Sequence, residues 1–97
     1  MITSPISLSK DIKVFPNPVH PSYSGNVTID GFVRDSRIKI TSVDGLLINE
    51  LRSQGGRATW NVRDFNGMEV ASGVYLILAS NEDGTEKIAG RVMVIRN

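Results

Sequence analysis

Short runs of alternating apolar and polar residues, each bounded by turn residues, make up most of the chain. Alternation with a period of two is typical of a half-buried β-strand, and no window keeps the period of about 3.6 residues that an amphipathic helix requires. Turn signals recur roughly every 8–12 residues, as in two packed antiparallel sheets. The pattern predicts an all-β fold, a β-sandwich of about seven short antiparallel strands. The predicted strands are Ile12–Phe15, Val27–Ile29, Ile38–Ile40, Leu46–Leu51, Arg57–Asn61, Gly73–Ala79 and Lys87–Ile95.

Tight turns are marked by three dipeptides, Asp44-Gly45, Asn66-Gly67 and Asp83-Gly84. The glycine in each supplies the positive φ that a hairpin turn requires, and the Asp or Asn side chain bonds to nearby backbone. A different signal, Pro16-Asn17-Pro18, ends the first strand, because neither proline can donate a hydrogen bond to a β-ladder.

The run from Val74 to Ala79 is almost wholly apolar. Such a run is typical of a strand that is buried on both faces or lies at the centre of a sheet. We expect Gly73, which has no Cβ, to let the chain pass close to a neighbouring strand. Trp60 and Tyr75 are predicted to pack in the core between the sheets rather than to form a ligand platform.

The length and the charge limit the classes of function. The 97 residues carry 11 basic and 10 acidic side chains, a net charge of +1, so no overall field would steer nucleic acid or an anionic membrane to the chain. The length fits one domain, which we place at residues 12–97 after a linker or disordered lead-in at 1–11. There is no cysteine, and every apolar run is far shorter than the ~20 residues of a membrane helix.

Candidate catalytic and metal-binding groups are sparse. His20 is the single histidine, and a lone histidine in a proline-containing loop is usually solvated. Asp64, Asn66 and Glu69 have the spacing of part of a calcium loop, but a full loop needs 12 residues and more carboxylates. We interpret that stretch as a capped turn, and we expect no enzyme activity, no metal and no cofactor. Five arginines in the middle third are expected to face outward and to keep strand edges from pairing; they are Arg34, Arg37, Arg52, Arg57 and Arg63. The alternative is a patch that binds an acidic sugar or a lipid head group, for which their spacing gives no support.

Four stretches in this order form a longer pattern: VFPNPV (Val14–Val19), GNVTIDG (Gly25–Gly31), IKITSVDGLLI (Ile38–Ile48) and GGRATWNVRDFNGMEVASGVYLI (Gly55–Ile77). Together with the short basic and apolar run at the end of the chain, they resemble the C-terminal sorting domain of the type IX (Por) secretion system. That family shares its pattern with the immunoglobulin-like domain of flagellar hook-capping proteins, so the resemblance implies that the predicted all-β fold is an immunoglobulin-like β-sandwich of about seven antiparallel strands. The motif positions of the resemblance are Pro16, Asn17, Pro18, Asp44, Gly45, Trp60, Asn66 and Gly67.

The resemblance implies a signal that the outer-membrane translocon reads on the folded domain after its cargo reaches the periplasm. A surface sortase then handles the cargo and links it to anionic lipopolysaccharide. The resemblance places the recognition surface on Gly73, Tyr75 and the last strand with Lys87, Arg91 and Arg96. The chain departs from the lysine-rich ending of many members, since it ends Val94-Ile95-Arg96-Asn97, and this puts sortase handling in question.

Within the family, the segment Phe15–Gly31 is most similar to the terminal domain of β-propeller surface components, the PorZ-like branch. That likeness implies a retained domain in a protein that presents lipopolysaccharide to the sortase. The alternative is a structural immunoglobulin-like spacer in a multidomain extracellular or hook-capping protein, which unlike a sorting domain need not end its parent chain. Binding of lipopolysaccharide to this domain and a homodimer through an exposed edge strand both stay open at this point.

Overall fold

The computed structural model describes residues 12–80 and 83–96, and the expected lead-in at 1–11 lies outside them. Seven strands form in this part of the chain, and none of it is helical. They are β1 (Lys13–Phe15), β2 (Val27–Asp30), β3 (Arg37–Ser42), β4 (Leu47–Arg52), β5 (Arg57–Trp60), β6 (Gly73–Ser80) and β7 (Glu86–Val94). Each predicted strand is present within a few residues of its expected bounds, so the alternation and the turn residues located the elements correctly.

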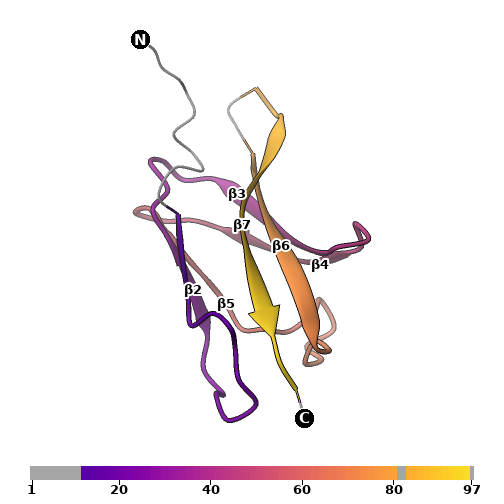
Figure 1. Ribbon diagram of the computed structural model, residues 1–97. Helices are drawn as coiled ribbons and strands as arrows, with labels where there is room; N and C mark the ends of the chain where they lie inside the picture. The colour runs from indigo at the N-terminus through magenta and orange to yellow at the C-terminus, as the bar shows by residue number, and fades with distance from the viewer. Residues whose placement is uncertain (1–11, 81–82, 97) are drawn as a thin grey trace.

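The strands form two antiparallel sheets that face each other (Figure 1). One sheet has the order β1-β2-β5, and the other has the order β4-β3-β6-β7. All strand pairs in both sheets are antiparallel. The predicted fold class, an immunoglobulin-like sandwich, is therefore confirmed.

The core lies between the sheets and is built from the inward-facing residues of both. Trp60 is fully buried, and its ring centroid lies 5.7 Å from that of Tyr75, whose side chain is 7% exposed. The two ring planes are inclined at 59°, between the offset-stacked and edge-to-face arrangements that aromatic pairs prefer. This confirms that Trp60 and Tyr75 are core residues. The largest aliphatic side chains around them are those of Ile29, Ile38, Ile40 and Ile77.

Strand β6 lies inside the four-stranded sheet, between β3 and β7 (Figure 1). Its inward residues Tyr75, Ile77 and Ala79 are buried, whereas Leu76 and Leu78 on the other face are half-buried. The apolar run thus marks a central strand, as one of the two expectations had it. Burial on both faces, the other expectation, is wrong, since the outer face of the sheet is only partly covered.

The turns follow the chemistry of their residues. Gly45 and Gly67 have φ values of 92° and 80°. In the second turn, one carboxylate oxygen of Asp64 accepts hydrogen bonds from the backbone N–H groups of Asn66 (2.9 Å) and Met68 (3.0 Å). The capped-turn interpretation of this stretch is therefore confirmed.

Candidate recognition surface along the last strand

Asn17 forms two side-chain hydrogen bonds with the backbone of β7 at the outer edge of this strand, and we call this contact the clamp. The side-chain amide of Asn17 donates a hydrogen bond to the carbonyl oxygen of Arg91 (3.1 Å), and its Oδ1 accepts one from the N–H of Met93 (3.0 Å). A side-chain amide carries the same donor and acceptor as a peptide unit. Asn17 therefore occupies the position that the backbone of an added strand would occupy.

Val19 extends this contact by two more backbone bonds. Its N–H donates to the carbonyl oxygen of Met93 (2.8 Å), and its carbonyl oxygen accepts from the N–H of Ile95 (2.8 Å). The resulting bridge between Val19 and Val94 is parallel. The chain thus leaves β1 in one sheet, passes through Pro16-Asn17-Pro18, and continues along the edge of the other sheet. Both X-Pro bonds of this motif are cis.

An irregularity in the ladder divides the charged residues of β7 between its two faces. The register with β6 shifts between Ile77 and Leu78. Arg91 is paired with Leu76 on the outer face, whereas Lys87 is paired with Ala79, whose side chain faces the core. Register partners lie on one face of a sheet, so the two cations point to opposite sides. Both are exposed.

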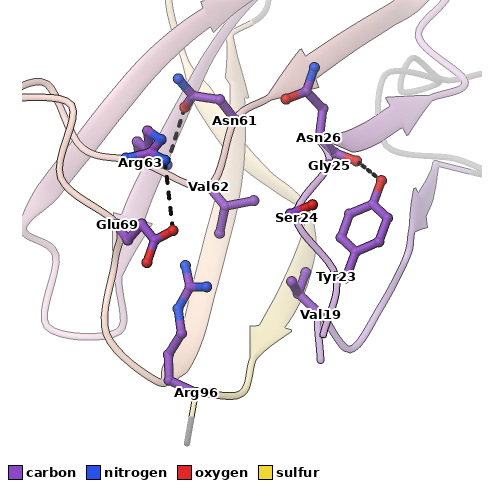
Figure 2. A pocket seen from close by; sticks show the side chains of 10 residues that line it. All are labelled: Val19, Tyr23, Ser24, Gly25, Asn26, Asn61, Val62, Arg63, Glu69 and Arg96. Atoms are coloured by element: carbon purple, nitrogen blue, oxygen red, sulfur yellow. Dashed lines mark hydrogen bonds and ion pairs between the residues drawn. The ribbon is translucent and has the colours of Figure 1, made fainter. Parts of the chain in front are cut away.

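Arg96, just beyond β7, lines a hollow of about 110 Å³. Figure 2 shows its guanidinium pointing toward Glu69. The Nε of Arg96 donates to the carbonyl oxygen of Val70 (2.9 Å), and Glu69 lies 3.7 Å from the guanidinium of Arg63. The hollow is lined by Val19, Tyr23, Ser24, Gly25, Asn26, Asn61, Val62, Arg63, Glu69 and Arg96.

Tyr75 has a structural role that is visible in its hydrogen bond. Its hydroxyl donates to the carbonyl oxygen of Ala71, four residues upstream, at 2.7 Å. A tyrosine near the start of such a strand, bonded back to the preceding backbone, is the tyrosine corner of immunoglobulin-like sandwiches. Burial raises the pKa of the Tyr75 hydroxyl, and the nearby Arg96 partly offsets this. The side chain faces the core rather than the surface.

Gly73 begins β6 and pairs with Val94. A Cβ built at Gly73 would meet only the ring of Tyr75, at 4.0 Å, which is an ordinary contact. The expected close backbone approach at Gly73 is therefore wrong. A close approach occurs at Gly56 instead, where a Cβ would lie 2.8 Å from the carbonyl oxygen of Phe32.

The structure thus does not bring the five residues of the expected recognition surface together in one place. Gly73 and Tyr75 lie within the sheet and the core, Lys87 and Arg91 lie on opposite faces of β7, and Arg96 lies in the hollow beyond its end. The sequence reasoning did not find the clamp, because Asn17 was interpreted only as part of a turn. It also did not find Val62, a β-branched residue with a φ of 62° that lines the hollow. No local sequence signal marks either feature.

The acidic side chains and the histidine of the described residues do not gather into a metal-binding group. These residues contain no cluster of three or more His, Cys, Asp or Glu side chains that could hold a metal. His20 is exposed. The pKa of Asp83 is lowered because its carboxylate accepts hydrogen bonds from the backbone and the side chain of Thr85. Nor is any helix in the described segments long and apolar enough to cross a membrane.

The two sheets, the tyrosine corner and the clamped last strand define an immunoglobulin-like β-sandwich of the kind that serves as a module in larger proteins. The model of the secretion system C-terminal sorting domain matches residues 13–94, from the start of β1 to the end of β7. The chain belongs to this family of sorting domains, and the resemblance drawn from its motifs is confirmed. Domains of this family act as signals and not as catalysts.

Two solved structures from Porphyromonas gingivalis are similar to the chain. One is PorZ, described as an essential bacterial surface component of the type IX secretion system; it is 35% identical, with a TM-score of 0.80 over 94% of this chain. The other is dimeric latent PorU, which is 23% identical, with a TM-score of 0.63 over 89% of this chain. The similarity to PorU concerns the fold alone. The chain spans 12% of the PorZ chain and 9% of the PorU chain, and no curated protein matches it.

Proposed function

We propose that the chain is a C-terminal signal domain that the type IX secretion translocon recognises for export across the outer membrane and attachment at the cell surface. The observation that carries the proposal is the family match across all seven strands. The 35% identity to PorZ supports the assignment to the type IX system. Transit through the periplasm, a surface sortase as partner and a parent protein of the PorZ-like kind are parts of the same proposal.

We further propose that the translocon contacts the margin of β7. Lys87, Arg91 and Arg96 provide positive charge along this margin, from the β6–β7 turn to the hollow beyond the strand. Gly73 and Tyr75 take part by holding β6 and β7 in register rather than by direct contact. The burial of Tyr75 and the pairing of Gly73 with Val94 support this part of the proposal.

A secretion assay tests the proposal. The 97-residue chain is fused to the end of a periplasm-targeted fluorescent reporter and expressed in a host with the type IX machinery and in a sibling without the translocon. We expect reporter at the surface of the competent host only. The size of the surface reporter then distinguishes a cleaved domain from a retained one. Folded fusion protein in the periplasm of both hosts would instead favour the spacer function.

A set of variants tests the margin of β7. We expect Lys87→Gln, Arg91→Gln and Arg96→Gln together to lower the surface reporter several-fold without loss of folding. The matched control removes three positive charges elsewhere, with Lys13→Gln, Arg34→Gln and Arg57→Gln. Equal losses in the two triple variants would show that the translocon responds to total charge and not to this margin.

A further inference from the structure

Arg37 and Arg52 lie directly opposite each other on β3 and β4. Opposed side chains in an antiparallel pair have Cβ atoms about 4.5–5.5 Å apart, and like charges in this position destabilise the pair. Both side chains are exposed, on the face opposite to that of the buried Ile38. Within residues 12–80 and 83–96, neither guanidinium forms a hydrogen bond or an ion pair.

Protection of a sheet edge does not explain this arrangement. Arg52 lies on the edge strand β4, but β3 is flanked by β4 and β6, so Arg37 lies inside the sheet. The expectation that Arg37 guards a strand edge is therefore wrong. Edge protection thus accounts for Arg52 alone, and the two arginines lie side by side with no ion-pair partner among the described residues.

Among the described residues, the neighbouring charges leave Arg37 and Arg52 with an excess of positive charge. Lys39 and Glu86 neutralise each other through an ion pair of 2.7 Å. Glu50, which is opposite Lys39 in the ladder, is the one further carboxylate among the described residues that line the surrounding hollows. Two guanidinium groups thus face one unpaired carboxylate. One of these hollows is open to solvent and is lined by Arg37, Lys39, Arg52, Ser80, Gly84 and Glu86.

We propose that Arg37 and Arg52 form a binding site for a phosphate group. A guanidinium presents a planar fork of N–H donors that matches a phosphate bidentately, and bonds between ionised partners are stronger than neutral ones. A phosphate held between two guanidinium groups removes their mutual repulsion. The hydroxyl of Ser80, on the wall of the hollow, supplies a further donor. The site lies outside the margin of β7 and does not depend on the proposed export function.

A titration with inorganic phosphate tests the site directly. The Nε–H resonances of the arginines are followed by NMR in the 97-residue chain, with sodium chloride at matched ionic strength as the reference. We expect saturable shifts at Arg37 and Arg52 and none at Arg57, which is paired with Asp30 on the other sheet. Arg37→Gln or Arg52→Gln should weaken phosphate binding tenfold or more, and Arg57→Gln should not. Shifts of equal size at all arginines, without saturation, would overturn the proposal.

Thermal unfolding without phosphate provides a second readout. Because the like charges repel, Arg52→Gln should raise the Tm at low salt by roughly 1–5 °C. Arg52→Lys, which keeps the charge, should not raise it. Added phosphate should raise the Tm of the unmodified chain more than that of Arg52→Gln. A lower Tm for Arg52→Gln than for Arg52→Lys, with no stabilisation by phosphate, would also overturn the proposal.

The phosphate group can belong to a soluble molecule or to a lipid headgroup. Co-sedimentation with vesicles of phosphatidylglycerol in phosphatidylcholine distinguishes the two sources. Vesicle binding that is lost in Arg37→Gln and in Arg52→Gln assigns a headgroup. Saturable binding of phosphate without vesicle binding assigns a soluble phosphate, and binding of neither overturns the site.

Discussion

The two halves of β7 belong to one strand but are held in different ways. The half that runs from Arg91 to Val94 pairs with β6 on one side and with Asn17 and Val19 on the other. Its residues Val92 and Val94 are buried in the core. The half from Glu86 to Gly90 pairs, among the described residues, with β6 alone. Ile88 in this half is 59% exposed.

The difference shows how this domain controls the edge of a sheet. Exposed N–H and C=O groups on an edge strand are a template for pairing with another chain. One half of β7 satisfies them by the side chain of Asn17 and the backbone of Val19. The other half carries Glu86 and Lys87 and a register irregularity, and charges and bulges of this kind discourage pairing. The half from Glu86 to Gly90, which we call the open half, is therefore the part of this edge that stays accessible, and it contains Lys87.

The difference in burial should produce the largest difference between the two halves in their contribution to the free energy of unfolding. Val92→Ala removes two methyl groups from a fully buried side chain, and we expect it to lower the free energy of unfolding by about 2 kcal/mol. Ile88→Ala, in the open half, should change it by less than about 0.5 kcal/mol. Urea denaturation at equilibrium measures both. Similar losses in the two variants would mean that the open half is packed against something in solution.

The clamp should contribute the next largest effect. Asn17→Ala removes two hydrogen bonds to β7, each with a net contribution of about 0.5–1.5 kcal/mol, so we expect a loss of about 1–3 kcal/mol in the free energy of unfolding. Amide hydrogen exchange should become faster at Met93 than at Ile95, because Ile95 keeps its bond to Val19.

Asn26→Ala is the matched control, since the Asn26 side chain forms no hydrogen bond among the described residues, and it should have little effect. Asn17→Asp sharpens the test. It keeps the acceptor for Met93 but places a carboxylate oxygen against the carbonyl of Arg91, so it should not restore full stability. If Asn17→Ala unfolds at the same urea concentration as the unmodified chain, the clamp has no net effect on stability.

Tyr75 is the register partner of Val92 in the clamped half of β7, which runs from Arg91 to Val94. It should make the stability of the fold sensitive to alkaline pH. Burial raises the pKa of its hydroxyl in the folded state above the unfolded value of about 10. The stability that this shift contributes is present below pH ~10 and is lost as the pH rises through the folded pKa. Tyr75→Phe should cost about 1 kcal/mol at neutral pH, because it removes the hydrogen bond to Ala71.

The Tm of Tyr75→Phe should then fall less steeply than that of the unmodified chain between pH 9 and pH 11.5. Every other side chain is the same in the two proteins, so the difference between the two curves isolates Tyr75. Parallel curves would show that ionisation of Tyr75 is not linked to unfolding.

The sequence was sufficient for the strands because the signals for strands are local. Alternation places Ala58 and Trp60 on one face within four residues, and Asp64 and Gly67 close a turn within one stretch. The clamp is different, since Asn17 and its two partners are 74 and 76 residues apart in the chain. No local pattern indicates that a side chain in a proline turn will bond to the last strand.

The candidate site was harder to predict than the fold for a related reason. The motif around Gly73 and Tyr75 marks the family, and the resemblance assigned recognition to it. The hydrogen bond to Ala71 shows that Tyr75 has a role in the sandwich itself. A family motif combines residues that build the fold with residues that a partner contacts, and spacing alone does not separate the two groups. Opposition of Arg37 and Arg52 likewise depends on the register of β3 and β4, which follows from their pairing.

Gly90 lies at the junction of the two halves of β7 and should give the smallest effect. A Cβ there would lie 3.5 Å from a methyl carbon of Val14 and 3.9 Å from one of Ile77, which are ordinary contacts. Its φ is not in the region that only glycine adopts readily. Gly90→Ala should therefore keep the free energy of unfolding within about 0.5 kcal/mol or raise it slightly, since alanine lowers the entropy of the unfolded chain.

Gly56→Ala is the contrasting control, because φ is 86° and a Cβ would clash with the backbone of Phe32; it should cost about 1–3 kcal/mol. A loss above about 1 kcal/mol in Gly90→Ala would mean that the irregularity in β7 requires glycine, so that the boundary between the halves is fixed by backbone conformation and not by the reach of the clamp.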